Sequence, residues 1–176
     1  MNAHPAAELF PLLSGADLEA LAADIGTNGL AEPIVLLDGQ ILDGRNRHAA
    51  CSMAGVDPSF SEYVGADPAA WVVSKNLHRR HLSESQRAMV AARLATLPRG
   101  ANQHRPIGLS RTQPDAAELL NVAARSVGRA RVVQQQGVPE LVAAVDSGAL
   151  AVSRAAGIAR LPAEDQRAAV RAPHVS

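Results

Sequence analysis

The chain has 176 residues, of which 47% are hydrophobic and only 2% aromatic, so it can form one ordinary domain or two small ones with a core of Ala, Leu and Val. Its 17 basic and 17 acidic residues cancel, and its single cysteine, Cys51, excludes a disulfide framework and a cysteine-based metal site. It contains neither a run of 18 apolar residues nor a signal-peptide pattern, which predicts a cytoplasmic protein without a membrane segment.

The charges are distributed unevenly along the chain. Residues 1–78 contain 10 acidic and 3 basic residues, residues 79–137 contain 3 acidic and 10 basic residues, and residues 138–176 contain 4 of each. A concentrated basic segment beside an acidic one favours a polyanion as the partner of the middle segment. The alternative is a basic helical face that contacts only solvent.

The first third of the chain predicts a small α/β unit. Residues 17–25 have apolar side chains at helical spacing, and we expect this helix to pack on the sheet that follows. Residues 33–37 and 40–42 flank Asp38-Gly39, a favoured pair for the tight turn of a β-hairpin. A helix is expected over residues 45–54 and is ended by Gly55, followed by a strand over 59–64 and a helix over 69–76 that Asp67-Pro68 opens.

The junction between the hairpin and the helix at residue 45 has the sequence DGRNR. Gly44 allows a sharp turn, and the first N–H groups of the following helix have no intrahelical partner. Because Arg45 and Arg47 add positive charge there, the junction is a candidate phosphate-binding site. The alternative is an ordinary strand-to-helix turn with solvated arginines.

The basic middle segment begins with a polar run over residues 76–81, which is either a solvated connector or a second wall of the anion site. Ser83 followed by Gln86 is a capping box and predicts a helix over residues 84–97. Residues 99–112 lack periodicity and predict a mobile loop. Its arginines, including Arg105 and Arg111, can become ordered on a phosphate backbone.

Residues 115–133 have the spacing of a helix-turn-helix. Ala117 is the small residue where two helices cross, and Asn121 occupies the turn position that needs a left-handed backbone. Ala123 takes the cap position, where serine is the better residue. The second helix is expected to present four side chains outward for DNA contacts: Arg125, Ser126, Arg129 and Arg131. The alternative is a purely structural helical hairpin.

The remaining sequence predicts short helices interrupted at Gly137, Gly148 and Leu161-Pro162, with apolar faces that cover the helix-turn-helix.

Three blocks, in this order, resemble the ParB/RepB/Spo0J-like partition protein family, whose N-terminal domain shares a fold with sulfiredoxin. They are NGLAEPIVL at residues 28–36, DGRNRHAA at 43–50 and KNLHRRHL at 75–82, and the helix-turn-helix follows as it does in the family. The resemblance covers nearly the whole chain from about Phe10 onward.

In that family the arginine block binds the triphosphate of CTP, and the third block supplies further contacts, including an asparagine near Mg²⁺. The resemblance therefore implies phosphate contacts from Gly44, Arg45, Asn46 and Arg47, a Mg²⁺ or phosphate contact from Asn76, and another phosphate contact from Arg79 or Arg80.

The resemblance leaves enzymatic activity doubtful. The family usually has Glu immediately before that asparagine, whereas this chain has Lys75. The carboxylate that would organise metal and water is therefore missing, and even weak CTP hydrolysis is doubtful. Sulfiredoxin chemistry is disfavoured, because Arg45 stands where the catalytic thiol belongs and Cys51 falls on the wrong side of the turn.

The sequence thus predicts a mostly helical α+β protein with a ParB/sulfiredoxin-like nucleotide-binding domain over residues 1–82 and an all-α DNA-binding domain over 83–176. The expected function is DNA binding in plasmid or mobile-element partition or in transcriptional control, modulated by CTP or another nucleotide with Mg²⁺. A partition ATPase and a second copy of the chain are further candidate partners. The alternatives are a nuclease or phosphotransferase with this fold and a DNA-binding adaptor that needs no nucleotide.

Overall fold

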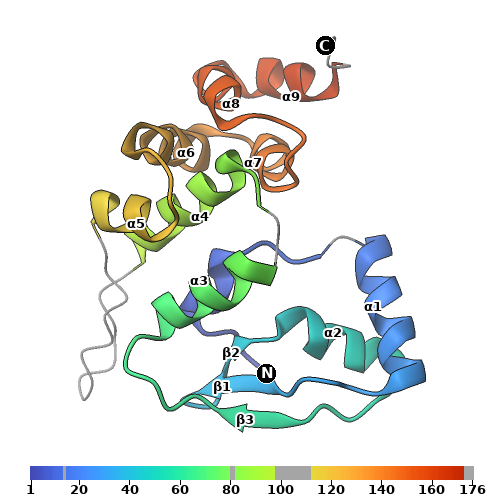
Figure 1. The fold of residues 1–176 in the computed structure, drawn as a ribbon. Coiled ribbons are helices and arrows are strands. Elements are labelled where there is room, and N and C mark those ends of the chain that lie inside the picture. The colour runs from blue at the N-terminus through green and yellow to red at the C-terminus, as the bar shows by residue number, and fades with distance from the viewer. Residues whose placement is uncertain (14, 80–81, 98–111, 173–176) are drawn as a thin grey trace. The chain divides into compact units, whose positions relative to one another are not determined.

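The structure of the protein is a computed structural model that describes residues 1–13, 15–79, 82–97 and 112–172 (Figure 1). It confirms the mostly helical α+β fold. The chain forms two compact units, which divide inside helix α3 (Pro68–Arg79) between Val72 and Val73. We call residues 1–72 the first unit and the described residues from 73 onward the second unit. The domain boundary after Leu82 stays a prediction.

The first unit contains a small sheet with the strand order β2-β1-β3. Strands β1 (Ile34–Leu37) and β2 (Gln40–Asp43) form the predicted antiparallel hairpin. Asp38 and Gly39 both have positive φ values, of 51° and 73°, as the expected type of tight turn requires. Strand β3 (Phe60–Glu62) pairs with β1 in parallel, is exposed along its whole length, and is shorter than predicted.

The N-terminal segment lies along the outer edge of β2. The N–H of His4 donates to the carbonyl of Ile41, and the N–H of Ile41 donates to the carbonyl of Asn2, both at 2.9 Å. The ring of His4 then caps a short 3₁₀ helix, η1 (Pro5–Leu9), by accepting the N–H of Ala6 at Nδ1. Burial lowers the pKa of His4, which keeps the ring in the neutral form that this cap needs, while Asp38 acts in the opposite direction.

Helix α1 (Gly15–Asn28) packs on helix α2 (Arg45–Ala54), as Figure 1 shows. The shared core contains Ala22 and Ile25 from α1 and Ala50 and Cys51 from α2. The prediction that the first helix packs mainly on the sheet is therefore wrong. The small Ala50 and Cys51 side chains give α2 a surface on which another helix can approach closely.

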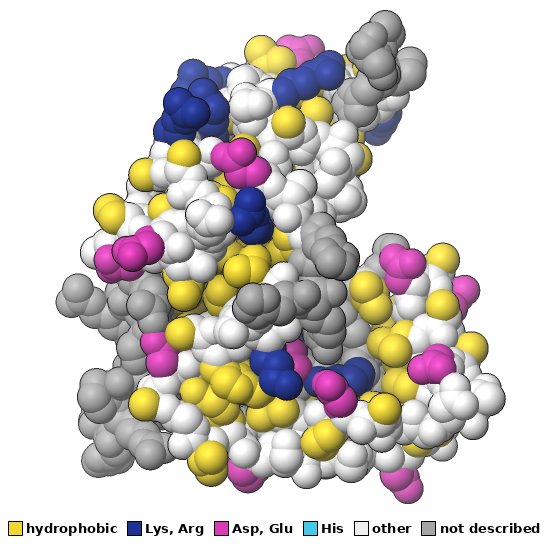
Figure 2. Space-filling view, viewed as in Figure 1, with side chains coloured by type: hydrophobic (Ala, Val, Ile, Leu, Met, Phe, Trp, Pro, Cys, Tyr) yellow, Lys and Arg dark blue, Asp and Glu magenta, His cyan; other side chains and the backbone are white. Residues whose placement is uncertain are grey.

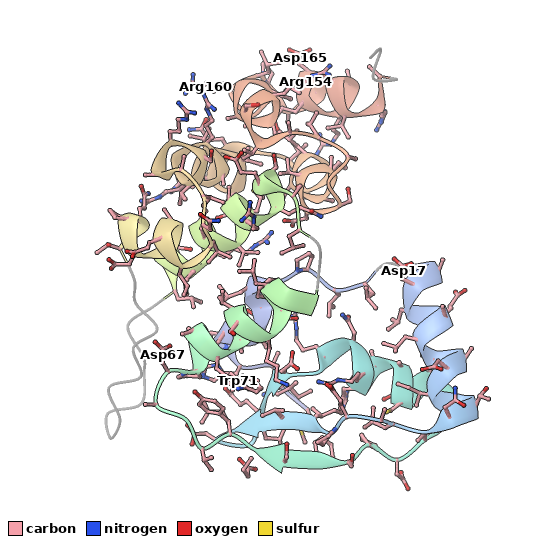
Figure 3. All side chains as sticks on the ribbon, viewed as in Figure 1. Asp17, Asp67, Trp71, Arg154, Arg160 and Asp165 are labelled. Atoms are coloured by element: carbon pink, nitrogen blue, oxygen red, sulfur yellow. The ribbon has the colours of Figure 1, made fainter. Side chains whose placement is uncertain are left out.

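Helix α3 starts where the sequence predicts. Pro68 is its first residue, and the Asp67 carboxylate accepts the N–H of Ala70 at 2.9 Å, which satisfies one of the free donors of the first turn. Trp71 lies in that first turn (Figure 3), and its ring centre is 5.2 Å from that of Tyr63. The edge of the sheet and the start of α3 are thereby tied together within the first unit.

The second unit is built around helix α4 (Glu84–Thr96), which contacts four of its neighbours. Both hydrogen bonds of the predicted capping box are formed between Ser83 and Gln86. The apolar face of α4 is almost entirely buried, including Met89, Val90 and Leu94. The other helices are α5 (Gln113–Leu119), α6 (Ala124–Gln136), α7 (Pro139–Asp146), α8 (Val152–Ile158) and α9 (Ala163–Arg171).

The breaks predicted in the last part of the chain are confirmed at all three places. Helix α8 packs on α6, so the tail covers the second helix of the predicted helix-turn-helix, as expected. None of the helices in the described part of the chain is long and apolar enough to cross a membrane.

A single buried amide joins the ends of four helices in the second unit. The Oε1 atom of Gln166 in α9 accepts the N–H of Val138, the residue before α7, at 2.8 Å. Its Nε2 atom lies within 2.9–3.0 Å of the carbonyls of Gln136, Ala159 and Leu161, which follow or end α6 and α8. Gln166 therefore satisfies backbone groups that the helix ends leave without intrahelical partners.

Replacing Gln166 by leucine is expected to lower the free energy of unfolding by about 3 kcal/mol, because a buried N–H and several carbonyls lose their partner. Urea denaturation measures the loss. The exposed Gln135→Leu variant on α6 is the matched control, with an expected change within about 0.5 kcal/mol. Equal losses in the two variants would show that Gln166 does not organise the helix ends.

Candidate functional site

The DGRNR turn forms a sharp strand-to-helix junction in the first unit. Strand β2 ends at Asp43, and Gly44 precedes α2 in the left-handed conformation with a φ of 100°. A Cβ atom at Gly44 would lie 3.2 Å from Nε and Nη2 of Arg47 and 3.4 Å from the Cα atom of Ile34. Glycine is therefore needed for the backbone angle and for the space that the arginine fills.

The guanidinium of Arg47 is held between two carboxylates. Its Nη2 atom is 2.8 Å from Oδ2 of Asp43, and its Nη1 atom is 2.9 Å from Oε2 of Glu32 and also donates to the Glu32 carbonyl at 3.1 Å. The Arg47 side chain is 11% exposed and that of Asp43 is 9% exposed, whereas that of Glu32 is 63% exposed. Arg47 thus joins the residues before β1 to the end of β2, and its charge is already neutralised.

The other polar side chains of the turn hold the segment that follows η1. The Nη2 atom of Arg45 donates to the carbonyl of Phe10 at 2.7 Å, and Oδ1 of Asn46 accepts the N–H of Leu13 at 3.1 Å. Burial lowers the pKa of Arg45, and Glu8 opposes this shift. All three side chains that were predicted to contact phosphate therefore have protein partners.

The start of α2 nevertheless keeps one property of an anion site. Its N-cap residue is Gly44, which makes no side-chain hydrogen bond to the start of the helix. The N–H groups of its first turn point along the helix axis, where the helix dipole favours negative charge. The backbone of the turn fits a phosphate group better than its arginine side chains do.

The described residues of the block at 75–82 lie in the second unit, whereas the turn lies in the first. Helix α3 continues through it to Arg79, and Asn76 is buried, with 3% of its surface exposed. The expectation of an exposed run is therefore wrong for Asn76, although Lys75 is exposed. The side chain of Arg79 and the whole of Arg80 lie outside the described residues. The contacts of Asn76, Arg79 and Arg80 with metal or phosphate stay predictions.

Among the described residues, no three His, Cys, Asp or Glu side chains come together in a way that could hold a metal ion.

Helices α5 and α6 are joined by the predicted turn. Asn121 has the left-handed conformation, with a φ of 48°, as its position in the sequence predicts. The N–H of Val122 donates to the carbonyl of Ala117, and the N–H of Asn121 donates to that of Glu118, each at 3.0 Å. These bonds close the end of α5 and fix the direction in which α6 leaves. Ala123 is the N-cap of α6 and, as expected for alanine, makes no side-chain cap.

The solvent-facing side of α6 carries three of the predicted DNA-binding residues: Arg125, Arg129 and Arg131 are all exposed. Ser126 is 5% exposed, and its Oγ atom hydrogen-bonds Oε1 of Glu84 at 2.9 Å. The expectation that Ser126 faces outward is therefore wrong, because it anchors α6 to the start of α4. Arg105 and Arg111, predicted to contact the DNA backbone, lie outside the described residues.

Two exposed arginines of the tail were missed as candidate residues. Arg154 lies in α8, and Arg160 follows the end of that helix; both are exposed. The tail was interpreted only as a cover for the helix-turn-helix. The available signal was an apolar periodicity that left Arg154 on the solvent side of a helix without carboxylates.

Replacing Arg47 by methionine is expected to lower the free energy of unfolding by about 3 kcal/mol, because the buried Asp43 carboxylate loses its cation. Glu32→Gln removes the exposed partner of the same arginine and should cost less than about 1 kcal/mol. Urea denaturation of both variants measures the difference. If Glu32→Gln lowered the free energy of unfolding as much as Arg47→Met, the buried Arg47–Asp43 pair would not be the main contribution of Arg47 to stability.

No protein-family model matches the chain, and no curated protein matches it in sequence. Two solved structures of the C-terminally truncated chromosome-partitioning protein ParB from Caulobacter crescentus are similar to it. The complex with the centromeric parS site is 20% identical, with a TM-score of 0.42 over 92% of this chain and 81% of that chain. The complex with CTP-gamma-S is 22% identical, with a TM-score of 0.35 over 92% of this chain and 87% of that chain. These values assign neither a function nor a ligand to this chain.

Proposed function

We propose that this chain is a ParB-like protein that binds duplex DNA through α6. The observation that carries the proposal is the α5–α6 pair, in which the left-handed Asn121 sets the turn and Arg125 and Arg129 are exposed one helical turn apart. Residues four apart lie on one face of a helix. A helix of this kind fits the major groove, where arginine can donate two hydrogen bonds to a guanine edge.

The charge of the sequence from residue 73 onward supports DNA as the partner. Residues 73–176 contain 15 basic and 7 acidic residues, a net charge of +8. Helix α6 contains three arginines and no carboxylate. A helix with this composition is attracted to the phosphate backbone before any base is contacted.

The proposal includes a nucleotide site of the CTP type at the DGRNR turn. The start of α2 at Gly44 would bind phosphate through its N–H groups, and Arg45 would lie beside it. Binding of a nucleoside triphosphate with Mg²⁺ at this site would change the affinity of the chain for DNA. The process served would be plasmid or mobile-element partition or transcriptional control.

A DNA-binding adaptor without nucleotide control is the second candidate. It is favoured by the engagement of Arg47 with Asp43 and Glu32, which leaves the turn without a free Arg47 charge. The composition of residues 1–72, with 10 acidic and 2 basic residues, also opposes an anionic ligand.

The DNA-binding proposal predicts sequence-dependent effects of α6 variants. Selection from a random pool of DNA duplexes is expected to yield a preferred site for the native chain. In Arg125→Gln or Arg129→Gln the preference should relax at one base pair, with a loss of about 1–3 kcal/mol on the selected site. The control is Arg171→Gln, which removes another exposed arginine, from α9. Unchanged affinity and base preference in both α6 variants would reject α6 as the recognition helix.

The nucleotide site is tested by calorimetric titration of the native chain with CTP, ATP and GTP, with and without Mg²⁺. We expect binding selective for CTP that is lost in Arg45→Gln and retained in Arg171→Gln. Glu32→Gln removes a carboxylate that competes for Arg47 and should strengthen binding by roughly threefold. If none of the three nucleotides bound while DNA did, the adaptor would be the correct function. Melting of each variant separates lost binding from lost folding.

A further inference from the structure

Helix α8 and the residues just after it present two arginines to solvent beside the helix proposed to enter DNA. One side of α8 is buried and contains Val152, Ala155 and Ala156. Arg154 and Arg160 are exposed, and Figure 3 labels both at the part of the second unit where α8 lies. Because α8 packs on α6, the exposed arginines of these two segments, which are separate in the sequence, belong to neighbouring parts of the second unit.

The positive charges of α6 and α8 are not balanced by carboxylates within the same helices. Neither α6 nor α8 contains an aspartate or glutamate. Within the described part of the chain, neither Arg154 nor Arg160 forms an ion pair. Figure 2 shows Lys and Arg side chains gathered over the part of the second unit that α6 and α8 form. Along the chain, the carboxylate nearest to Arg154 is Asp146, which pairs with Arg93, and the one nearest to Arg160 is Glu164, exposed in the first turn of α9.

The spacing of packed helices determines what α8 would meet on DNA. Packed helices have axes about 8–10 Å apart, and the major groove is about 12 Å wide. A helix packed beside one in the groove therefore does not fit in the same groove. If its exposed side chains lie on the same side as those of the helix in the groove, they meet the sugar-phosphate backbone at the border of that groove, where arginine contacts add affinity without reading a base.

We propose that Arg154 and Arg160 form a second DNA-contacting element, which binds backbone phosphates bordering the groove that α6 enters. This inference rests on the proposed DNA binding through α6 and assigns a role to a helix that would otherwise only cover it. The two elements then have different tasks: α6 selects the sequence, and α8 adds affinity that is the same for all sequences and depends strongly on salt.

The test measures the affinity of the full chain for its selected duplex and for a random-sequence duplex, over a range of salt concentrations. The Arg154→Gln/Arg160→Gln double variant should lose about tenfold in affinity per arginine in about 0.1 M salt, equally for both duplexes. The slope of log affinity against log salt should fall in magnitude by about 2. Arg171→Gln is the matched control and should change neither quantity.

The outcomes separate this inference from the function on which it rests. If Arg125→Gln and Arg129→Gln weakened binding while the α8 double variant matched Arg171→Gln, α8 would be only a structural cover, and DNA binding through α6 would stand. A loss confined to the selected duplex would also overturn the backbone role of Arg154 and Arg160. If the native chain bound neither duplex, the proposed function would fail and this inference with it.

Discussion

The ion pair between Arg47 and Asp43 is the constraint on which the first unit depends. It lies mostly buried at the point where β2 ends and α2 begins, and Glu32 extends it to the residues before β1. Gly44 leaves room for Arg47 in this position, because a Cβ atom there would lie 3.2 Å from the guanidinium. A turn whose sequence resembles a phosphate-binding motif thus uses its second arginine to hold the first unit together. Any anion at the start of α2 binds beside a guanidinium whose charge is already compensated.

The two units differ in how their arginines are used. In the first unit, Arg45 and Arg47 are the only basic residues of residues 1–72, and both bind protein groups. In the second unit, arginines of α6 and α8 remain exposed on helices that have no carboxylates. The interior of the second unit is held instead by neutral or paired groups, such as Gln166 at the helix ends and Ser126 with Glu84. Its positive charge is therefore available to a partner.

The sequence predicted the features that a few neighbouring residues decide. Asp38-Gly39 specified the hairpin, and Ser83 with Gln86 specified the start of α4. Asn121 marked the turn between α5 and α6, and the end of α2 was expected at Gly55. In each case the deciding interaction is a backbone conformation or a hydrogen bond within a few residues, which local sequence contains completely. The resemblance to the partition family likewise rested on short blocks.

Tertiary structure alone decided which polar side chains remain available to a ligand. Arg47 was predicted to face phosphate, but Glu32, fifteen positions earlier, binds it. Ser126 was expected to be exposed, but it is buried and hydrogen-bonds Glu84, 42 positions away. Helix α1 packs on α2 because the small residues of α2 leave room for it. Periodicity tells which residues share a helix face, whereas burial depends on which distant segment covers that face. The local sequence does not encode that contact.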